Sequence, residues 1–430
     1  MSQEPPLVSV VMISFNHAQY LRETINSVLS QSMGNLELIF VDNNSTDNTQ
    51  EIIKEIKDPR FIPCWQENLG VSLATNLGIE KARGAFIAIA SADDAWYPEK
   101  LAKQLAALEK SGAGVSFTNV EYIGDDGIRV DPPVHQAPGL ANSASSTDSR
   151  IESPGLFFAE QLPRHELFAR LFWKSNFLCA TSALVKRKFL PELGFNPSLI
   201  QLQDFEMWVR LIKKTDFSIL PEKLVGYRVR GDGQNLSMDQ RNANRVHFEL
   251  NLVYRHFFED LDPALFVQSF AKQFKGSNLL EEKKASQSTG LQSSASLSIS
   301  DIHFNFEQAF LFLQKQESAI KQIGIEKLYS LMNTEAGRVT GSRDYNLLIT
   351  DVWDLARLPL FARDSCKNEE GNSAGDYVGE DALGLLERLR AQEKELDESR
   401  NTIRHLTSGK MWKLRNGVYS ILRKLSGPNT

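Results

Sequence analysis

Short apolar runs alternate with amphipathic stretches along about the first 120 residues. The runs are rich in β-branched residues, which is typical of strands buried on both faces of a parallel sheet. Between them, apolar residues recur at helical spacing, as in 20–31. This alternation predicts an α/β fold with a doubly wound, mostly parallel sheet and right-handed crossovers. The expected strands are 7–14, 36–41, 61–65, 85–90 and 115–120.

A weakly patterned segment interrupts this alternation. Residues 131–153 are rich in Pro, Ser, Ala and Gly and are expected to form a mobile loop near the site. Strands are expected again at 181–185, 217–220 and 224–230, and an amphipathic helix at 202–211. The pattern ends near residue 235, so the first predicted domain is 1–235.

A helical pattern replaces the α/β pattern from residue 241. Residues 247–274 and 301–332 repeat apolar positions at helical spacing, with many phenylalanines among them. Such a stripe is interpreted as core rather than as a ligand site. Residues 277–300 have the composition of a linker. We therefore expect a helical accessory domain over 241–366, for which no motif predicts a role.

Two further segments are expected near the C-terminus. Leu389, Leu396 and Ile403 repeat every seven residues, which predicts a short coiled coil over 376–408 and self-association through it. The last segment, 409–430, is predicted to be a basic amphipathic helix. Between positions 410 and 425 it has five basic residues and no acidic one, which is typical of a helix on an anionic membrane surface. A terminal helix packed against the protein is the alternative.

Composition narrows the class of protein. The 430 residues carry a net charge of −6 and no basic arm, so nucleic acid is not an expected partner. Three cysteines without paired spacing fit a reducing compartment and exclude a cysteine-based zinc ribbon. The N-terminus has no signal-peptide pattern, and no apolar run approaches about 18 residues. The expected location is cytoplasmic, or peripheral at the inner face of the cell membrane.

An acidic pair gives the first indication of chemistry. Asp93 and Asp94 directly follow the expected strand 85–90. The carboxyl end of a parallel strand faces the crevice where open α/β sheets bind ligands. Carboxylates there can hold a divalent cation, Mn²⁺ or Mg²⁺, which neutralises a diphosphate.

The first ~235 residues contain five motifs in an order that resembles the family 2 glycosyltransferases of the GT-A fold. The resemblance implies an inverting enzyme that uses a nucleotide-sugar donor. The C-terminal segment is also similar to the tails of bacterial glycosyltransferases that act on lipid-linked or surface polysaccharides. The five motifs are Val10–Asn16, Val41–Asp47, Asn68–Asn76, Ser91–Asp94 and Gln203–Asp204.

The resemblance implies a role for each matching residue. Asp204 falls where the family keeps its catalytic base. Asp94 matches the metal ligand, and Asp93 lies nearer the ribose. Arg228 or Arg230 could add positive charge to the diphosphate. The remaining donor-binding residues, four of which grip the nucleoside, are Phe15, Asn16, Asp42, Asn43 and Asn76.

Three positions depart from the family pattern. Asn43 stands where many members have the acidic residue that reads a uracil base. Thr75 replaces a frequent arginine, which removes one phosphate contact. Arg230 occupies a position often taken by histidine near the metal. None of these changes removes the expected metal ligand or base.

The leading hypothesis is a metal-dependent inverting glycosyltransferase. It would transfer a sugar to a saccharide or lipid-linked acceptor in cell-envelope or exopolysaccharide synthesis. One alternative is a sugar nucleotidyltransferase, which is disfavoured because no glycine-rich phosphate loop follows the first strand. The other is a non-catalytic scaffold of a polysaccharide assembly complex, against which the intact Asp93, Asp94 and Asp204 argue.

Overall fold

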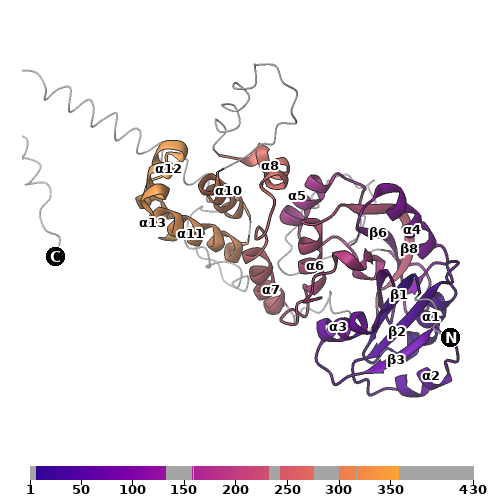
Figure 1. Cartoon of the computed structure of the whole chain (residues 1–430). Coiled ribbons are helices and arrows are strands. Elements are labelled where there is room, and N and C mark those ends of the chain that lie inside the picture. The colour runs from indigo at the N-terminus through magenta and orange to yellow at the C-terminus, as the bar shows by residue number, and fades with distance from the viewer. Residues whose placement is uncertain are drawn as a thin grey trace, which may run out of the picture. The chain divides into compact units, whose positions relative to one another are not determined.

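A computed structural model of the chain describes residues 6–131, 157, 159–231, 243–275, 300–315 and 317–357 (Figure 1). Contacts divide the chain into two compact units, Met1–Phe304 and Asn305–Thr430. The expected boundary near residues 235–241 thus lies inside the first unit. The expected loop 131–153, coiled coil 376–408 and basic helix 409–430 lie outside the described residues, apart from Asp131.

The first unit is built on an eight-stranded sheet in the order β3-β2-β1-β4-β7-β6-β8-β5. Six strands run in one direction, while β7 and β5 run antiparallel to their neighbours. The prediction of a mostly parallel α/β sheet is confirmed. The strands are β1 Val8–Ser14, β2 Leu36–Asp42, β3 Phe61–Trp65, β4 Phe86–Ser91, β5 Ala95–Trp96, β6 Val115–Ile123, β7 Leu184–Lys186 and β8 Phe217–Arg228.

Two strand predictions need correction. The strands expected at 217–220 and 224–230 are one strand, β8, which stays paired with β6 through irregular register near Asn119. The strand expected at 181–185 begins later, because Ala180–Ser182 forms a 3-10 turn before β7. Tertiary pairing, rather than local pattern, decides both boundaries.

Helices cover both faces of the sheet. Val10 and Met12 of β1 share an apolar cluster with Leu21 and Ile25 of α1. A Cβ at Gly78 of α3 would come within 2.3 Å of Val11, so α3 lies on the opposite face and requires glycine there. The helices beside the sheet are α1 Ala18–Leu29, α2 Thr49–Glu55, α3 Val71–Lys81, α4 Lys100–Ser111 and α6 Gln203–Ile212.

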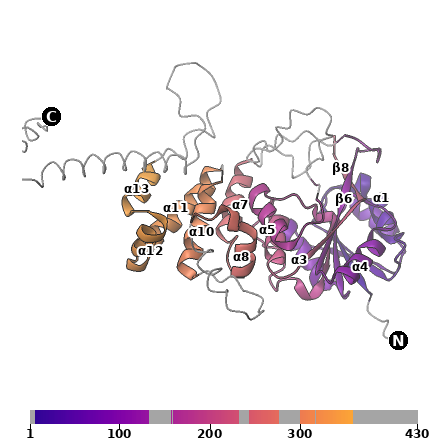
Figure 2. The same cartoon turned by 90° about the horizontal axis from the view of Figure 1, so that it is seen from above.

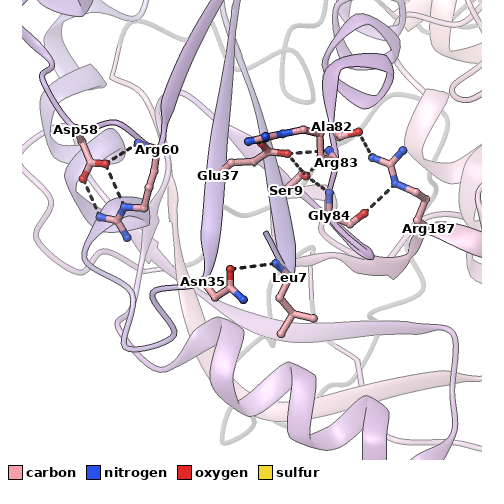
Figure 3. Close-up of polar contacts among 10 residues, drawn as sticks. All are labelled: Leu7, Ser9, Asn35, Glu37, Asp58, Arg60, Ala82, Arg83, Gly84 and Arg187. Carbon is pink, nitrogen blue, oxygen red and sulfur yellow. Dashed lines mark hydrogen bonds and ion pairs between the residues drawn. The ribbon is translucent and has the colours of Figure 1, made fainter. Parts of the chain in front are cut away.

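A polar network joins the amino ends of three parallel strands (Figure 3). The buried carboxylate of Glu37 in β2 accepts hydrogen bonds from the Ser9 hydroxyl of β1, at 2.6 Å, and from the Arg83 amide, at 2.7 Å. The Arg83 guanidinium donates to the same carboxylate. Arg187 donates to the carbonyl oxygens of Ala82 and Gly84 in the turn before β4. These contacts fix the edge of the sheet opposite the acidic pair.

The first part of the phenylalanine-rich region belongs to the first unit. Helices α5 Arg164–Lys174, α7 Ala243–Arg255 and α8 Pro263–Phe270 lie side by side (Figure 2). Phe172 of α5 contacts Tyr254, Phe257 and Phe270, with ring centroids 5.3–5.7 Å apart. All four rings are buried, which confirms that these aromatic residues form core.

The second unit is helical throughout its described residues. Phe306 stacks against Tyr345, and the Phe310 ring lies tilted against it with centroids 5.3 Å apart. A Cβ at Gly324 would come within 2.7 Å of the Ala309 carbonyl oxygen. No helix in the described ranges has the length and apolar content of a membrane span. The helices are α10 Asp301–Leu313, which begins in the first unit, α11 Ser318–Met332, α12 Glu335–Tyr345 and α13 Ile349–Arg357.

Candidate active site

The acidic pair lies in the turn that joins β4 to β5, where both carboxylates are buried. The Ser91 hydroxyl donates to Asp93 Oδ1. The backbone N–H of Arg228 donates to Asp94 Oδ1 at 2.9 Å, and the Thr181 hydroxyl donates to the same carboxylate. The turn is therefore held by β4, by β8 and by the segment before β7.

The electrostatics of the turn favour a bound cation. Burial raises the pKa of Asp94 well above its usual value, and the neighbouring charge of Asp93 raises it further. Two adjacent carboxylates offer the hard oxygen ligands that Mg²⁺ and Mn²⁺ prefer. The described residues contain no group of three or more His, Cys, Asp or Glu side chains suited to a metal. The residues present therefore fit a cation that takes its other ligands from a diphosphate and water.

The Arg228 side chain holds this turn in place through hydrogen bonds. Its side chain is fully buried at the end of β8. Nε donates to the Asp93 carbonyl oxygen at 2.7 Å, Nη1 donates to the Gly124 carbonyl oxygen at 2.6 Å, and Nη2 pairs with Glu23 at 2.7 Å. Its guanidinium carbon also lies 4.6 Å from the Tyr20 ring centroid. These bonds tie together the carboxyl ends of β4, β6 and β8.

The loops after β1 and β2 form one connected surface. Asn16 adopts a positive φ of 58° and accepts a hydrogen bond from the Thr46 amide at 2.8 Å. Asp42 is fully buried and accepts from the Ser45 amide, at 3.0 Å, and from Gln50, at 2.6 Å. The ring of Phe15 is 42% exposed beside this loop pair, so an apolar face remains open to a ligand.

Asp204 lies in the first turn of α6 and is half-buried. Its Oδ2 accepts from the Asn176 amide at 2.8 Å, and its Oδ1 accepts from the Phe205 backbone N–H at 2.7 Å. Burial raises the pKa of Asp204 to about 6, although both hydrogen bonds act to lower it. A carboxyl group with this pKa is ionised at neutral pH and is a stronger base than an exposed one.

One short segment links Asp204 to the acidic pair. Asn176 donates to Asp204, and Thr181, five residues later, donates to Asp94. Five residue steps span at most about 18 Å. Between them, burial raises the pKa of the Cys179 thiol, and the charges of both Asp94 and Asp204 raise it further. One short segment therefore holds both carboxylates, and the charge of each acts on the same thiol.

The family can now be assigned. Residues 9–194 match the model of the Glycosyl transferase family 2. These residues form a family 2 glycosyltransferase domain. They contain the loops after β1 and β2, the acidic pair and the Asn176–Thr181 segment, whereas Asp204 and β8 follow the matched range.

Curated relatives of this chain carry glycosyltransferase names. A glycosyltransferase of Methanocaldococcus jannaschii is 29% identical over 284 residues, which cover 61% of this chain and 89% of that protein. The UDP-Glc:alpha-D-GlcNAc-diphosphoundecaprenol beta-1,3-glucosyltransferase WfaP of Escherichia coli is 35% identical over 133 residues, which cover 30% of this chain and 52% of WfaP. The chain thus spans about half the length of WfaP. The structure of S. aureus TarS 1–349 in complex with UDP-GlcNAc aligns with a TM-score of 0.46 and 15% identity over 81% of this chain and 91% of that one.

Other expected site residues of the glycosyltransferase domain have structural partners. The Asn76 amide accepts from the Phe195 backbone N–H at 2.7 Å and donates to the Phe195 and Leu193 carbonyl oxygens. Thr75 donates to the Val71 carbonyl oxygen within α3. Arg230 lies near Tyr20, with its guanidinium carbon 5.9 Å from the ring centroid. Asn76 therefore holds the 193–195 loop, while Arg230 lies near the same Tyr20 ring as Arg228.

Gln66 and Trp65, near the loops expected to bind the nucleoside, were not predicted from the sequence. Asn43 Oδ1 accepts from Gln66 at 2.7 Å, and Asn43 Nδ2 donates to Asn68 at 3.0 Å. Trp65, at the end of β3, is 53% exposed. The predicted strands could have indicated these residues, because the residues that follow neighbouring parallel strands such as β2 and β3 meet at one edge of the sheet. No such signal exists for Asn176 or Thr181.

Proposed function

We propose that this chain is an inverting glycosyltransferase with a metal-bound nucleotide-sugar donor. The acceptor is a hydroxyl group of a saccharide or a lipid-linked saccharide in cell-envelope polysaccharide synthesis. The observation that carries the proposal is that one short segment holds both carboxyl groups, since Asn176 donates to Asp204 and Thr181 donates to Asp94. An inverting transfer requires both a base and a site for the leaving diphosphate.

Asp204 acts as the base in this proposal. Its pKa of about 6 leaves it ionised at neutral pH and able to take a proton from the acceptor hydroxyl. The hydrogen bond from Asn176 holds the carboxylate in place. The hydroxyl oxygen then attacks the anomeric carbon from the face opposite the nucleoside diphosphate, which accounts for inversion.

In this proposal, Asp93 and Asp94 bind the nucleotide-sugar donor through the cation. When bound, Mg²⁺ or Mn²⁺ neutralises the negative charge that develops on the departing diphosphate. Arg230, whose guanidinium carbon lies 5.9 Å from the Tyr20 ring centroid, is proposed to add positive charge to that diphosphate. Arg228 positions the turn, because its guanidinium donates to the Asp93 and Gly124 carbonyl oxygens and pairs with Glu23.

A uridine nucleotide is the donor that the chemistry of the pocket supports best. The Asn43 amide group, with Gln66 and Asn68, presents both donors and acceptors, which suits a uracil edge. Phe15 and Trp65 offer exposed rings on which a base can stack. WfaP, a relative, is named for a UDP-Glc donor and a diphosphoundecaprenol-linked acceptor.

The test combines binding with product analysis. Thermal stabilisation by UDP, GDP, ADP and CDP is measured with and without Mn²⁺, and active pairs are then assayed for transfer. Asp94→Asn should lose Mn²⁺-dependent stabilisation, and Asp204→Asn should keep it while losing at least about 100-fold in kcat. Asp216→Asn, an exposed carboxylate before β8, is the matched control.

The outcomes separate the alternatives. Release of a nucleoside diphosphate supports a glycosyltransferase, whereas release of pyrophosphate supports a nucleotidyltransferase. Donor binding without any transfer to lipid-linked or free saccharides would favour the scaffold. Full activity in Asp204→Asn would remove the assigned base.

A further inference from the structure

A buried carboxylate from α7 binds the loop that leads to Asp204. Glu249 is only 2% exposed. Its two oxygens accept hydrogen bonds from three consecutive backbone N–H groups, those of Ile200 at 2.9 Å, Gln201 at 2.8 Å and Leu202 at 2.9 Å. Bonds from backbone N–H groups to an ionised carboxylate are among the stronger hydrogen bonds in proteins.

These bonds determine where α6 begins. Leu202 precedes the first residue of α6, and no side chain of its own caps the helix. The first N–H groups of a helix and of the approach to it need acceptors when they are buried. Glu249 supplies acceptors for three successive groups, so the backbone two residues before Asp204 is fixed from α7.

The charge of Glu249 also reaches Asp204. Burial is the main cause of the raised pKa of Asp204, and the negative charge of Glu249 raises it as well. The other groups that face Asp204 are the Asn176 amide, which lowers the pKa, and the Cys179 thiol, whose own pKa Asp204 raises. Among charged groups, Glu249 has the largest effect on the pKa of Asp204.

We propose that Glu249 is a positioning residue of the glycosyltransferase, which orients Asp204 through the 200–202 backbone and places a second negative charge beside it. The inference rests on the proposed role of Asp204 as the base. It gives α7, which follows the family-matched residues 9–194, a part in the reaction. We expect nucleotide binding to be independent of Glu249, because its hydrogen bonds go to the backbone of residues 200–202.

The experiment compares Glu249→Gln with Glu249→Asp in the full chain. Glutamine keeps the size but loses the charge, and its NH₂ group faces a backbone donor. We expect kcat to fall about 10- to 100-fold, with the KM for the donor unchanged. The acid limb of the kcat–pH profile should move to lower pH, because removing a negative charge lowers the pKa of Asp204.

The Glu249→Asp variant separates the effect of the charge at residue 249 from the effect of its position. Glu249→Asp keeps the charge but shortens the reach, so kcat should fall while the acid limb stays close to that of the natural chain. Asn244→Ala, an exposed position in α7, is the control for general effects on this helix. Circular dichroism and thermal unfolding establish that each variant is folded.

Two results would overturn the inference. One is a Glu249→Gln protein with natural kcat and natural pH profile. The other is a fall in kcat that matches a loss of folded protein, with the acid limb unmoved. The result for Asp204→Asn is independent. If that variant is fully active, the proposed base fails, whereas an inactive Asp204→Asn beside a normal Glu249→Gln removes only the positioning role.

Discussion

At Asp204, burial and hydrogen bonding act in opposite directions on one carboxyl group. Desolvation raises its pKa, while bonds from Phe205 and Asn176 lower it, and the balance is a pKa of about 6. The folded protein thus binds this proton more tightly than the unfolded chain, in which the pKa is close to 3.8. Ionised Asp204 therefore costs stability above pH 6, and the cost disappears as the pH falls from 6 to 3.8.

Asp204→Asn should accordingly be more stable than the natural chain at pH 8. A pKa raised from 3.8 to about 6 corresponds to about 3 kcal/mol at most, and part of this gain is lost because the NH₂ group of asparagine faces one of the two donors, Asn176 or Phe205. The difference should shrink towards pH 4.5, where natural Asp204 is largely protonated. Urea unfolding at both pH values measures this, with Asp216→Asn as control. An equal difference at both values would contradict the raised pKa.

At the level of elements, two polar networks hold opposite ends of the parallel strands of one sheet. Arg228 joins the carboxyl ends of β4, β6 and β8, and Glu37 joins the amino ends of β1 and β2 to the turn before β4. Both groups are buried and both bond to backbone. Only the first network touches the acidic pair, so the two networks should differ in their effect on donor binding.

Arg228→Met should therefore weaken both stability and donor binding. It leaves the Asp93 and Gly124 carbonyl oxygens without their donor and Glu23 without its cation. A loss of about 3 kcal/mol is expected, mainly because backbone carbonyl oxygens shielded from water lose a charged donor, whereas Glu23 is 50% exposed and contributes little. Calorimetry with UDP and Mn²⁺ should show weaker binding.

Glu37→Gln is the matched control for Arg228→Met, since it disturbs a comparable network at the far end of the strands. It should lower the free energy of unfolding by about 1–2 kcal/mol and leave the Kd for UDP unchanged. Similar effects of both substitutions on UDP binding would show that Arg228 acts only through general stability.

For the whole molecule, attachment to a membrane is proposed to depend on residues 410–430, which lie outside the described residues. The segment carries five basic residues, each expected to contribute about 1 kcal/mol at an anionic surface. Deleting 410–430 should release the chain from vesicles containing anionic lipid at moderate salt, as measured by sedimentation. Neutral vesicles are the control. Unchanged sedimentation of the shortened chain would contradict this role.

The sequence by itself determined the fold class and the positions of the chemically active groups. The spacing of apolar residues indicates strands and helices because the buried face of each element recurs at the residue period of that element. Because parallel strands run in one direction, their carboxyl ends place Asp42, Asp93 and Asp94 at the same edge of the sheet.

Only the tertiary structure decided how these groups work together. Asn176 and Thr181 carry no local signal, yet they bond to Asp204 and Asp94. Arg228 and Asn76 matched the motif of a donor site, but both have backbone partners that give them supporting roles. Glu249 lies 45 residues after Asp204 in the sequence and still binds the loop beside it. Such contacts depend on how distant segments pack, and hydrophobic periodicity along one segment contains no information about its distant neighbours.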